Sequence, residues 1–598
     1  MSRRASLLSL MAPLLLAVLP AEHADAAFAF DGAALTGTAP SRSPVAPASP
    51  AAAPATSAFS QSAPRVPRAD TSERADSTEQ TGPDAPPAAA DRLPPRFHAR
   101  RRRAVLEALP PDAVAVLFSS PRRTREKSIR YPYRQNSNLY YLTGATAPAS
   151  VLILAPGGLR VGRDTTKEVL FVPPSSRRSE RWTGPRLTPA QAERVLGVEK
   201  ALPHTRFADV LERAVQAPTG RDGRRLFHLP LPYGIEEDSE LAKQVAAFRD
   251  AARLMPEATS PLTRRAVEVM RTVDRPEAFD TFQRQFSRRL SADAFQTAFL
   301  RRAYRQFTGA ASLEAWTRWR SEHFGPTRAD GQRLQTVLAR LRQQKTSAEQ
   351  HLVRRAAQIT AEAQKAALRT IEPGAHEYEV AAAAEYVITK NGAEATAFPS
   401  VVGSGKNASV LQYHDNRRRM QRGELVVVNV GAEYHGYAAD VTRTAPVDGS
   451  FSKQQRALYT LVLKAQKAAI RAARPGNNFR DPRQVARRIL GNGLAERGLI
   501  DTPDDVGRYL TPSTSHYLGL SVHDAGRGGP LEPGAVLAIE TGLHLPASSG
   551  DLPKRWRGLG VRIGDDVLVT EDGPVVLSKD APREIDALEA LMRQPRSL

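Results

Sequence analysis

Asn429 and Asp440 are the first residues whose type and spacing suggest chemistry. They lie in two β-rich runs around a turn near residues 434–436, a pattern typical of a β-hairpin. A turn centred between residues 434 and 435 would place them directly opposite, with Cβ atoms roughly 5 Å apart. A turn one residue later would make them diagonal neighbours. Two oxygen-bearing side chains on one sheet face can hold a hard metal ion; the alternative is a polar pair on a solvated face.

Three later segments add groups of the same kind. His516 and His523 lie close together in a chain with only 12 histidines, and Glu540 lies within an apolar, strand-like run. Burying an unpaired carboxylate is costly, so Glu540 needs a partner. The run 561–566 brings Arg562 and two aspartates into another apolar segment. Each feature alone is more often structural, but together they favour a metal site built from carboxylates and imidazole.

Two α/β regions must position these groups. In the first, helical spacing over 99–109 is followed by apolar runs that are typical of strands. These runs are 114–118, 150–154 and 168–172. They predict an α/β domain over 93–237. Residues 238–345 instead show apolar positions at helical spacing and no catalytic constellation, and they are predicted to form a helical insert or linker.

The second region is predicted to span 346–598. Thr346 and Glu349 form a capping box, which marks the start of a helix. A second helix is expected through about 376–390. From there to about residue 578 the pattern predicts strands and hairpins, and a closing helix is expected over about 583–593.

The N-terminus has the pattern of an export signal. Arg3 and Arg4 precede a short apolar run, and residues 24–26 (Ala-Asp-Ala) fit the small-x-small cleavage rule. Residues 1–26 are therefore predicted to be a signal peptide, for Sec or twin-arginine export, and the Ala/Pro/Ser-rich residues 27–92 a disordered tether. We expect an exported, periplasmic or secreted protein with no transmembrane segment in the mature chain. The alternative is an uncleaved anchor or a wrongly assigned start.

Composition narrows the class of protein further. The 598 residues contain no cysteine, which excludes disulfides, Cys-ligated zinc, iron–sulfur clusters and cysteine nucleophiles. The net charge of +21 leaves binding of nucleic acid or another anionic polymer open. The one tight basic run, 100–103, opens a predicted helix, and no base-reading motif accompanies it. Nucleic acid is therefore a disfavoured partner.

Long, ordered segments of the second region resemble the pita-bread metallopeptidases Xaa-Pro aminopeptidase (aminopeptidase P) and prolidase. They are AFPSVVGSGKNASVLQYHDN, ELVVVNVGAEYHGYAADVTRTAPV, TSHYLGLSVHDAG, VLAIETGLHLP and GLGVRIGDDVLVTEDGPVVLS. In the first region, RRRRAVLEAL and YRQNSNLYYLTGATAPASVLIL resemble the aminopeptidase P N-terminal domain. The resemblance implies an α/β N-terminal domain of the creatinase/aminopeptidase P type and an α+β pita-bread C-terminal domain, with the helical insert between them.

The resemblance also implies a metal centre. In that family two divalent ions, usually manganese, are held by ligands in the order Asp, Asp, His, Glu, Glu, and they activate a water that attacks the scissile carbonyl. By position the second Asp is Asp440, the His is His516 and the first Glu is Glu540, which would also shuttle protons. His523 and Arg562 match positions that contact substrate or support the site.

Four positions depart from the family pattern. Asn429 stands where the first Asp is expected, and Gly564 stands where the last Glu is expected. Asp565 cannot substitute for that Glu without a bulge, because consecutive strand residues face opposite sides. Gln412 and Pro512 stand where two histidines near the substrate are expected. The remaining two carboxylates and one histidine suit one divalent ion at most, or none.

Taken together, the sequence predicts an exported member of the Xaa-Pro aminopeptidase family with a degraded dinuclear site. Such a pseudoenzyme-like protein would be weakly active or inactive. It would bind a peptide with proline at its second position, or a protein segment, in the cleft that holds the substrate in active family members. One alternative is an active Xaa-Pro aminopeptidase with one divalent metal; another is a basic-surface binder of an anionic polymer. The resemblance is also compatible with a homo-oligomer.

Overall fold

The computed structural model describes residues 91–595, apart from 128, 217–223, 238, 253–259, 296–297, 324–328 and 511–514. All of the described residues lie in one compact unit, Pro64–Leu598. The predicted signal peptide, all but the last two residues of the predicted tether, and Pro512 lie outside the described residues. Within the described ranges, every helix is too short or too polar to cross a membrane.

The first domain is built on a six-stranded sheet with the order β6-β5-β4-β1-β7-β8. Its strands are β1 (Ala113–Phe118), β4 (Val151–Val161), β5 (Asp164–Val172), β6 (Ala201–Pro203), β7 (Arg225–His228) and β8 (Ala329–Asp330). All six side chains of β1 are buried, and alternate residues belong to two different hydrophobic clusters. Both faces of the sheet are therefore covered, which explains why the predicted strand at 114–118 has no polar alternation.

Helices and one hairpin complete this domain. They are α1 (Pro95–Ala108), α2 (Ser137–Thr143), α3 (Arg177–Thr183), α4 (Pro189–Leu196), α5 (Phe207–Gln216), and the hairpin of β2 (Thr124–Glu126) and β3 (Ile129–Arg130). The helix expected over 99–109 corresponds to α1, and each of the three predicted strands lies at a strand of the sheet.

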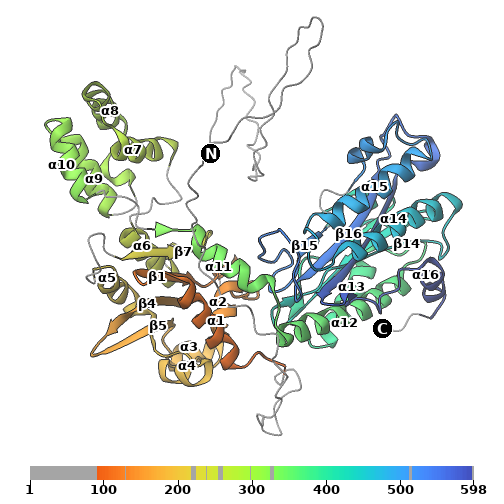
Figure 1. Cartoon of the computed structure of the whole chain (residues 1–598), viewed down its shortest axis with the longest axis horizontal. Helices are drawn as coiled ribbons and strands as arrows, with labels where there is room; N and C mark the ends of the chain where they lie inside the picture. Colours follow the sequence, from red (N-terminus) through yellow and green to blue (C-terminus); the bar gives the residue numbers. More distant parts are fainter. Residues whose placement is uncertain are drawn as a thin grey trace, which may run out of the picture. The chain divides into compact units, whose positions relative to one another are not determined.

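The residues predicted as a helical insert, 238–345, do not form one separate body. They contain α6 (Glu240–Ala252), α7 (Pro261–Thr272), α8 (Pro276–Arg289), α9 (Ala298–Gly309), α10 (Leu313–His323) and α11 (Gln332–Gln343). The first and last of these helices pack into the clusters of the first domain, and β8 joins its sheet. Only α7–α10 share a core of their own, around Trp316 (Figure 1, yellow-green). Helical spacing reveals a helix but not the core on which it packs.

The second domain contains a seven-stranded sheet with the order β10-β11-β14-β17-β16-β15, in which β18 also pairs with β17. The strands are β10 (Val401–Ser404), β11 (Leu425–Val430), β14 (Val441–Pro446), β15 (Ser515–Tyr517), β16 (Val536–Leu545), β17 (Leu559–Thr570) and β18 (Gly573–Val576). A small sheet adds β9 (Ala395–Thr396), β12 (Ala432–Tyr434) and β13 (Tyr437–Ala438). Every pairing in both sheets is antiparallel.

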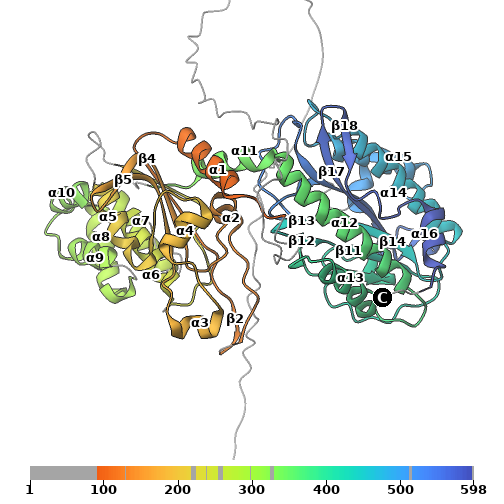
Figure 2. The ribbon, with the colours of Figure 1, turned by 90° about the horizontal axis from the view of Figure 1, so that it is seen from below.

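Five helices complete this domain; three of them contact strands of these sheets, and the other two pack mainly on those helices (Figure 2). They are α12 (Ser347–Thr370), α13 (Glu377–Lys390), α14 (Lys453–Ala472), α15 (Asp481–Ala495) and α16 (Ile585–Met592). The capping box at the start of α12 is confirmed, with Thr346 N–H donating to Glu349 Oε2 at 3.0 Å. The prediction of strands and hairpins alone from 392 to 578 is wrong, because α14 and α15 interrupt them. Ser452 and Gln455 form a second capping box that marks the start of α14.

Candidate metal and peptide site

The hairpin brings Asn429 and Asp440 together as diagonal neighbours. Its turn residues, His435 and Gly436, both have positive φ, 48° and 81°, as the two central residues of a type I′ turn do. Asn429 is therefore paired with Thr442 rather than with Asp440. The directly opposed register is wrong, and the turn lies one residue later. Asp440 is two residues before Thr442 and faces the same side of the strand.

Asp440 and His516 form a nearly buried pair at this site. The Nδ1 of His516 donates to the Val522 carbonyl at 2.8 Å, because a carbonyl can only accept. Its Nε2 therefore faces Asp440 Oδ2, 3.3 Å away. Burial lowers the pKa of His516, but the hydrogen bond and charge of Asp440, with the charge of Glu540, outweigh this and raise it to about 9. Without a metal, His516 is thus an imidazolium paired with Asp440.

This pair gives stability a definite dependence on pH. A histidine whose pKa rises from 6.5 to about 9 on folding stabilises the protein fully below pH 6.5, and that stabilisation is lost as pH rises through about 9. In metal-chelating buffer we therefore expect the free energy of unfolding, measured by urea denaturation, to fall between pH 6.5 and 9. The His516→Gln variant should lose this slope. An identical slope in both proteins would contradict the pairing.

Glu540 accepts hydrogen bonds from two neighbouring side chains. Its Oε1 accepts from Asn429 Nδ2 at 3.0 Å and also from the Thr442 hydroxyl. A carboxylate only accepts, so the Asn429 amide must turn its NH₂ towards it. Burial, together with the charge of Asp440, raises the pKa of Glu540. The amide and hydroxyl thus stand beside Glu540 where the family resemblance predicts a second cation.

Gly564 lies in β17 directly between Thr442 of β14 and Glu540 of β16. A Cβ at this position would lie 2.9 Å from Glu540 Cγ and 3.2 Å from Thr442 Cβ. The glycine contributes no side chain, and the side chains of Glu540 and Thr442 lie close to the position that its Cβ would occupy. A larger residue at position 564 would require Glu540 to move.

The two aspartates that follow do not replace the missing ligand. Asp565 faces the other side of β17, as predicted, and is fully buried between Arg443 and Arg583, at 2.8 and 2.7 Å. Asp566 faces the same side as Gly564, but its carboxyl accepts from the Asp440 backbone N–H at 3.1 Å. Burial and the charge of Asp440 raise the pKa of Asp566 well above its ordinary value. Neither carboxyl lines the cleft.

Asn429, Asp440 and Glu540 line a cleft of about 920 Å³. His523 lines it and meets His516 edge to face, with ring centroids 4.5 Å apart. Burial and the charge of His516 lower the pKa of His523. Arg562 and the exposed Gln412 also line the cleft. Its other lining residues include Arg134, Glu433, Ala397, Phe398, Pro399, Val401, Leu411 and His414.

Three donors fit one divalent ion. Ligand atoms of Asp440, His516 and Glu540 all lie within 4.8 Å of one another. The Oδ1 atoms of Asp440 and Asn429 are buried and have no hydrogen-bond partner among the described residues. Both are therefore able to bind a cation or accept a hydrogen bond. Two carboxylates and one imidazole suit a single ion. Within the described ranges, no further carboxylate or histidine joins this group.

The sequence predicted the three residues that the structure groups, Asp440, His516 and Glu540. Several residues that contact them or line the cleft were not predicted from it. Thr442 and Asp566 each lie two residues from a predicted site position, Asp440 and Gly564, and the period of two along a strand could have found them. Arg134 could not have been found this way. It comes from the first domain and pairs with Glu433 at 2.6 Å, a contact made only in the folded chain.

Comparisons with known proteins agree on the family of both domains. The profile described as Metallopeptidase family M24 matches residues 351–571, and that of the Aminopeptidase P N-terminal domain matches residues 98–220. The Xaa-Pro aminopeptidase of Escherichia coli (strain K12) is 30% identical over 505 residues, which cover 82% of this chain and 96% of that protein. The mitochondrial intermediate cleaving peptidase 55 of Arabidopsis thaliana is 30% identical over 495 residues, 82% of each protein.

Solved structures show the same fold. Pseudomonas aeruginosa aminopeptidase PepP has a TM-score of 0.64 and 28% identity, and the match covers 84% of this chain and 98% of that one. An alanine variant of Escherichia coli aminopeptidase P in complex with substrate has a TM-score of 0.65 and 28% identity with the same coverage.

Proposed function

Because this chain belongs to the Xaa-Pro aminopeptidase family of M24 metallopeptidases, we propose that it is a peptide-binding member with a degraded hydrolytic site. It holds at most one divalent ion, manganese by resemblance, and hydrolyses Xaa-Pro peptides weakly or not at all. Its ligand is a peptide with proline at the second position, or a protein segment of similar shape, bound in the cleft. Family members of this kind require a divalent metal for hydrolysis.

One observation supports the loss of two-metal chemistry above the others. The Asn429 amide donates to Glu540 Oε1 at 3.0 Å, and Gly564 offers no side chain on the facing strand. A hydrogen-bond donor therefore stands beside a carboxylate that would otherwise share a cation. Each transition-state contact of this kind is worth about 10²–10³ in rate, so the loss of two ligands predicts a drop of several orders of magnitude.

The cleft itself remains suited to a peptide. Its apolar wall includes Phe398 and Pro399, and its polar groups include Arg562 and His523. A volume of about 920 Å³ accommodates several residues. The described residues give Arg562 no carboxylate within ion-pair distance, which leaves its guanidinium able to bind a peptide carbonyl or carboxylate.

A second candidate function is supported by the three remaining donors. Asp440, His516 and Glu540 could hold one divalent ion, which when bound supplies an activated water. Glu540 would then take the proton of that water, and Asp440 and His516 would orient the ion. An active single-metal Xaa-Pro aminopeptidase is this alternative.

Metal analysis and a hydrolysis assay distinguish the two. After dialysis against manganese, we expect well under two ions per chain, and hydrolysis of an Xaa-Pro peptide several orders of magnitude below that of the Escherichia coli relative assayed beside it. The same peptide should still bind in a calorimetric titration. Asp440→Ala is the control, since it should remove any remaining ion and any remaining turnover.

Three results would overturn the proposal. Two tightly bound manganese ions per chain would show that the ligand set is complete after all. Turnover close to that of the relative, lost in Asp440→Ala, would favour the single-metal enzyme instead. Absence of peptide binding at millimolar concentration would remove the binding function.

We also propose that the chain is exported. Arg3, Arg4 and the apolar run before residues 24–26 support a cleaved signal peptide. N-terminal sequencing of protein from the cell envelope or medium should begin near Ala27, and recovery of Met1 would contradict export.

A further inference from the structure

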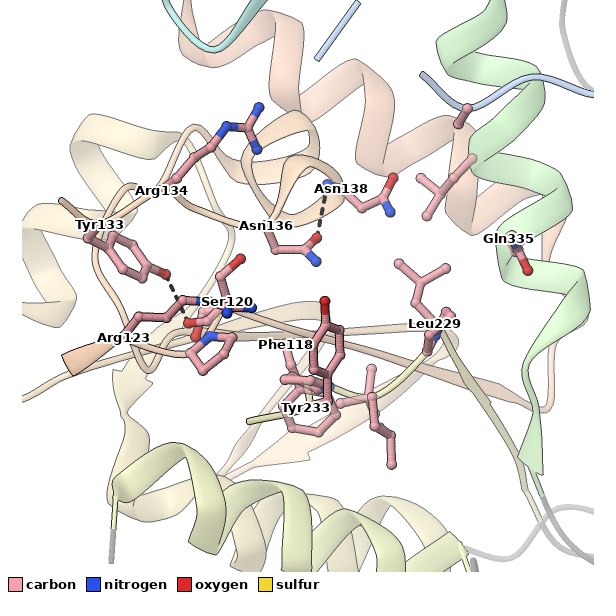
Figure 3. Close-up of a pocket in the computed structure, with 18 of the residues that line it drawn as sticks. Phe118, Ser120, Arg123, Tyr133, Arg134, Asn136, Asn138, Leu229, Tyr233 and Gln335 are labelled. Carbon is pink, nitrogen blue, oxygen red and sulfur yellow. Dashed lines mark hydrogen bonds between the residues drawn. The ribbon is translucent and has the colours of Figure 1, made fainter. Parts of the chain in front are cut away.

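A second cavity, of about 600 Å³, lies mainly in the first domain (Figure 3). It is bordered by the end of β1, by segments 132–138 and 229–233, and by α11. None of the described residues that line it is an aspartate or a glutamate. Arg134 is the one lining residue that the cavity shares with the cleft, and its charge is already paired with Glu433.

Two side-chain amides can donate to a ligand in this cavity. Asn136 Oδ1 accepts from the backbone N–H groups of Asn138 and Leu139 at 3.0 and 3.2 Å. Asn138 Oδ1 accepts from Arg342 Nη1 at 2.7 Å. With both oxygens engaged, each amide presents its NH₂ group, which has no partner among the described residues. Figure 3 shows these amides and the Tyr233 hydroxyl facing the same open space.

Arg123 and Tyr233 supply charge and a flat surface. The guanidinium of Arg123 lies 5.8 Å from the ring centroid of Tyr233, within cation–π range. It forms no ion pair with any residue that the structure describes. Tyr233 is 72% exposed, and it lines the cavity together with Leu229. An exposed aromatic ring beside an unpaired cation and two amide donors matches a ligand that is anionic and rich in acceptors.

We propose that this cavity is a second ligand site, which binds the carboxylate end of a peptide. The carboxylate would accept from Arg123, the amides of Asn136 and Asn138 would donate to main-chain carbonyls, and apolar side chains would pack on Tyr233 and Leu229. A peptide fits better than a lone small anion, because the cavity is far larger than one carboxylate and its donors are spread over several residues. The site does not depend on the proposed function of the cleft.

Fluorescence anisotropy with the full chain tests this site. The probe is a labelled, N-acetylated peptide with a free C-terminal carboxylate, so that no amine can bind in the cleft. Arg123→Gln should weaken binding about tenfold or more through loss of a charge-assisted contact, and Tyr233→Ala by a similar factor through loss of an aromatic packing surface. Both residues are exposed, so folding is preserved. Arg125→Gln, an exposed arginine in the same hairpin that lines no described cavity, is the matched control and should bind as the unaltered chain does.

Further peptides identify the source of the carboxylate. The same peptide with a C-terminal amide should bind at least about tenfold more weakly. An amidated peptide with an internal aspartate that binds and depends on Arg123 would support the same carboxylate chemistry from a side chain. Asp440→Ala should leave probe binding unchanged. Equal binding of free and amidated peptides, or equal affinity in the Arg123 and Tyr233 variants, would overturn the proposal.

Discussion

Asn429→Asp combined with Gly564→Glu is expected to raise the manganese content from at most one to two ions per chain. The first change replaces the amide that donates to Glu540 Oε1 at 3.0 Å, and the second adds a carboxylate between Thr442 and Glu540. Four carboxylates and His516 can then balance two dications. Since the bound ions stabilise the folded chain by mass action, about 2.7 kcal/mol at a hundred times the dissociation constant, melting temperature should rise with added manganese.

The matched control is Asn429→Asp with Gly564→Ala. At position 564 this variant adds the same Cβ, 2.9 Å from Glu540 Cγ, but no carboxylate. It should therefore hold one ion at most. Metal analysis and calorimetric titration measure both variants. Hydrolysis should recover only in part, because Gln412 and Pro512 are unchanged. If the variant with both added carboxylates binds the same number of manganese ions per chain as the unaltered protein, positions 429 and 564 do not belong to the metal site.

Asp565→Ala is expected to destabilise the protein by about 3–5 kcal/mol, the cost typical of breaking a buried ion pair. Asp565 is fully buried between Arg443 and Arg583 and also accepts from Ser578 at 2.9 Å. Although burial acts to raise it, the two guanidinium groups hold the pKa of Asp565 below its ordinary value. Removal of the carboxylate leaves Arg443, itself fully buried, without its one ion-pair partner among the described residues.

Urea denaturation measures this loss of stability. The control is Asp572→Ala, an exposed turn residue on the next loop, which should change the free energy of unfolding by less than about 0.5 kcal/mol. A destabilisation of less than about 1 kcal/mol for Asp565→Ala would show that Arg443 finds another partner.

Much of the fold could be predicted because its elements have strong local signals. The capping box at Thr346 and Glu349 marks α12, and the apolar run at 114–118 marks β1. The helix α14 was not predicted, although Ser452 and Gln455 form an equivalent capping box. The strand-like segments on both sides of it led to a prediction of strands throughout. Helical spacing also does not show on which core each helix of residues 238–345 packs, since the packing partner of a helix is decided by tertiary contacts.

The sequence predicted which residues come together at the candidate site, but not the hydrogen bonds that they form there. Motif order identified Asp440, His516 and Glu540, and spacing alone allowed two hairpin registers. Only the folded chain shows that the Asn429 amide turns its NH₂ to Glu540, or that Glu540 occupies the space beside Gly564. Those facts depend on strands far apart in the sequence, and residue types alone do not fix them.

The hydrogen bond between Asn429 and Glu540 also bears on how this lineage can change. A chain that acquires Asn429→Asp alone places a third carboxylate beside Asp440 and Glu540, while position 564 still offers no ligand to a second ion. A chain that acquires Gly564→Glu alone forces Glu540 aside and carries the same excess of charge. Each single reversal is opposed, and only the pair together recreates a complete ligand set. Under the proposed function, loss of either ligand alone abolishes two-metal chemistry, whereas its return requires both residues together.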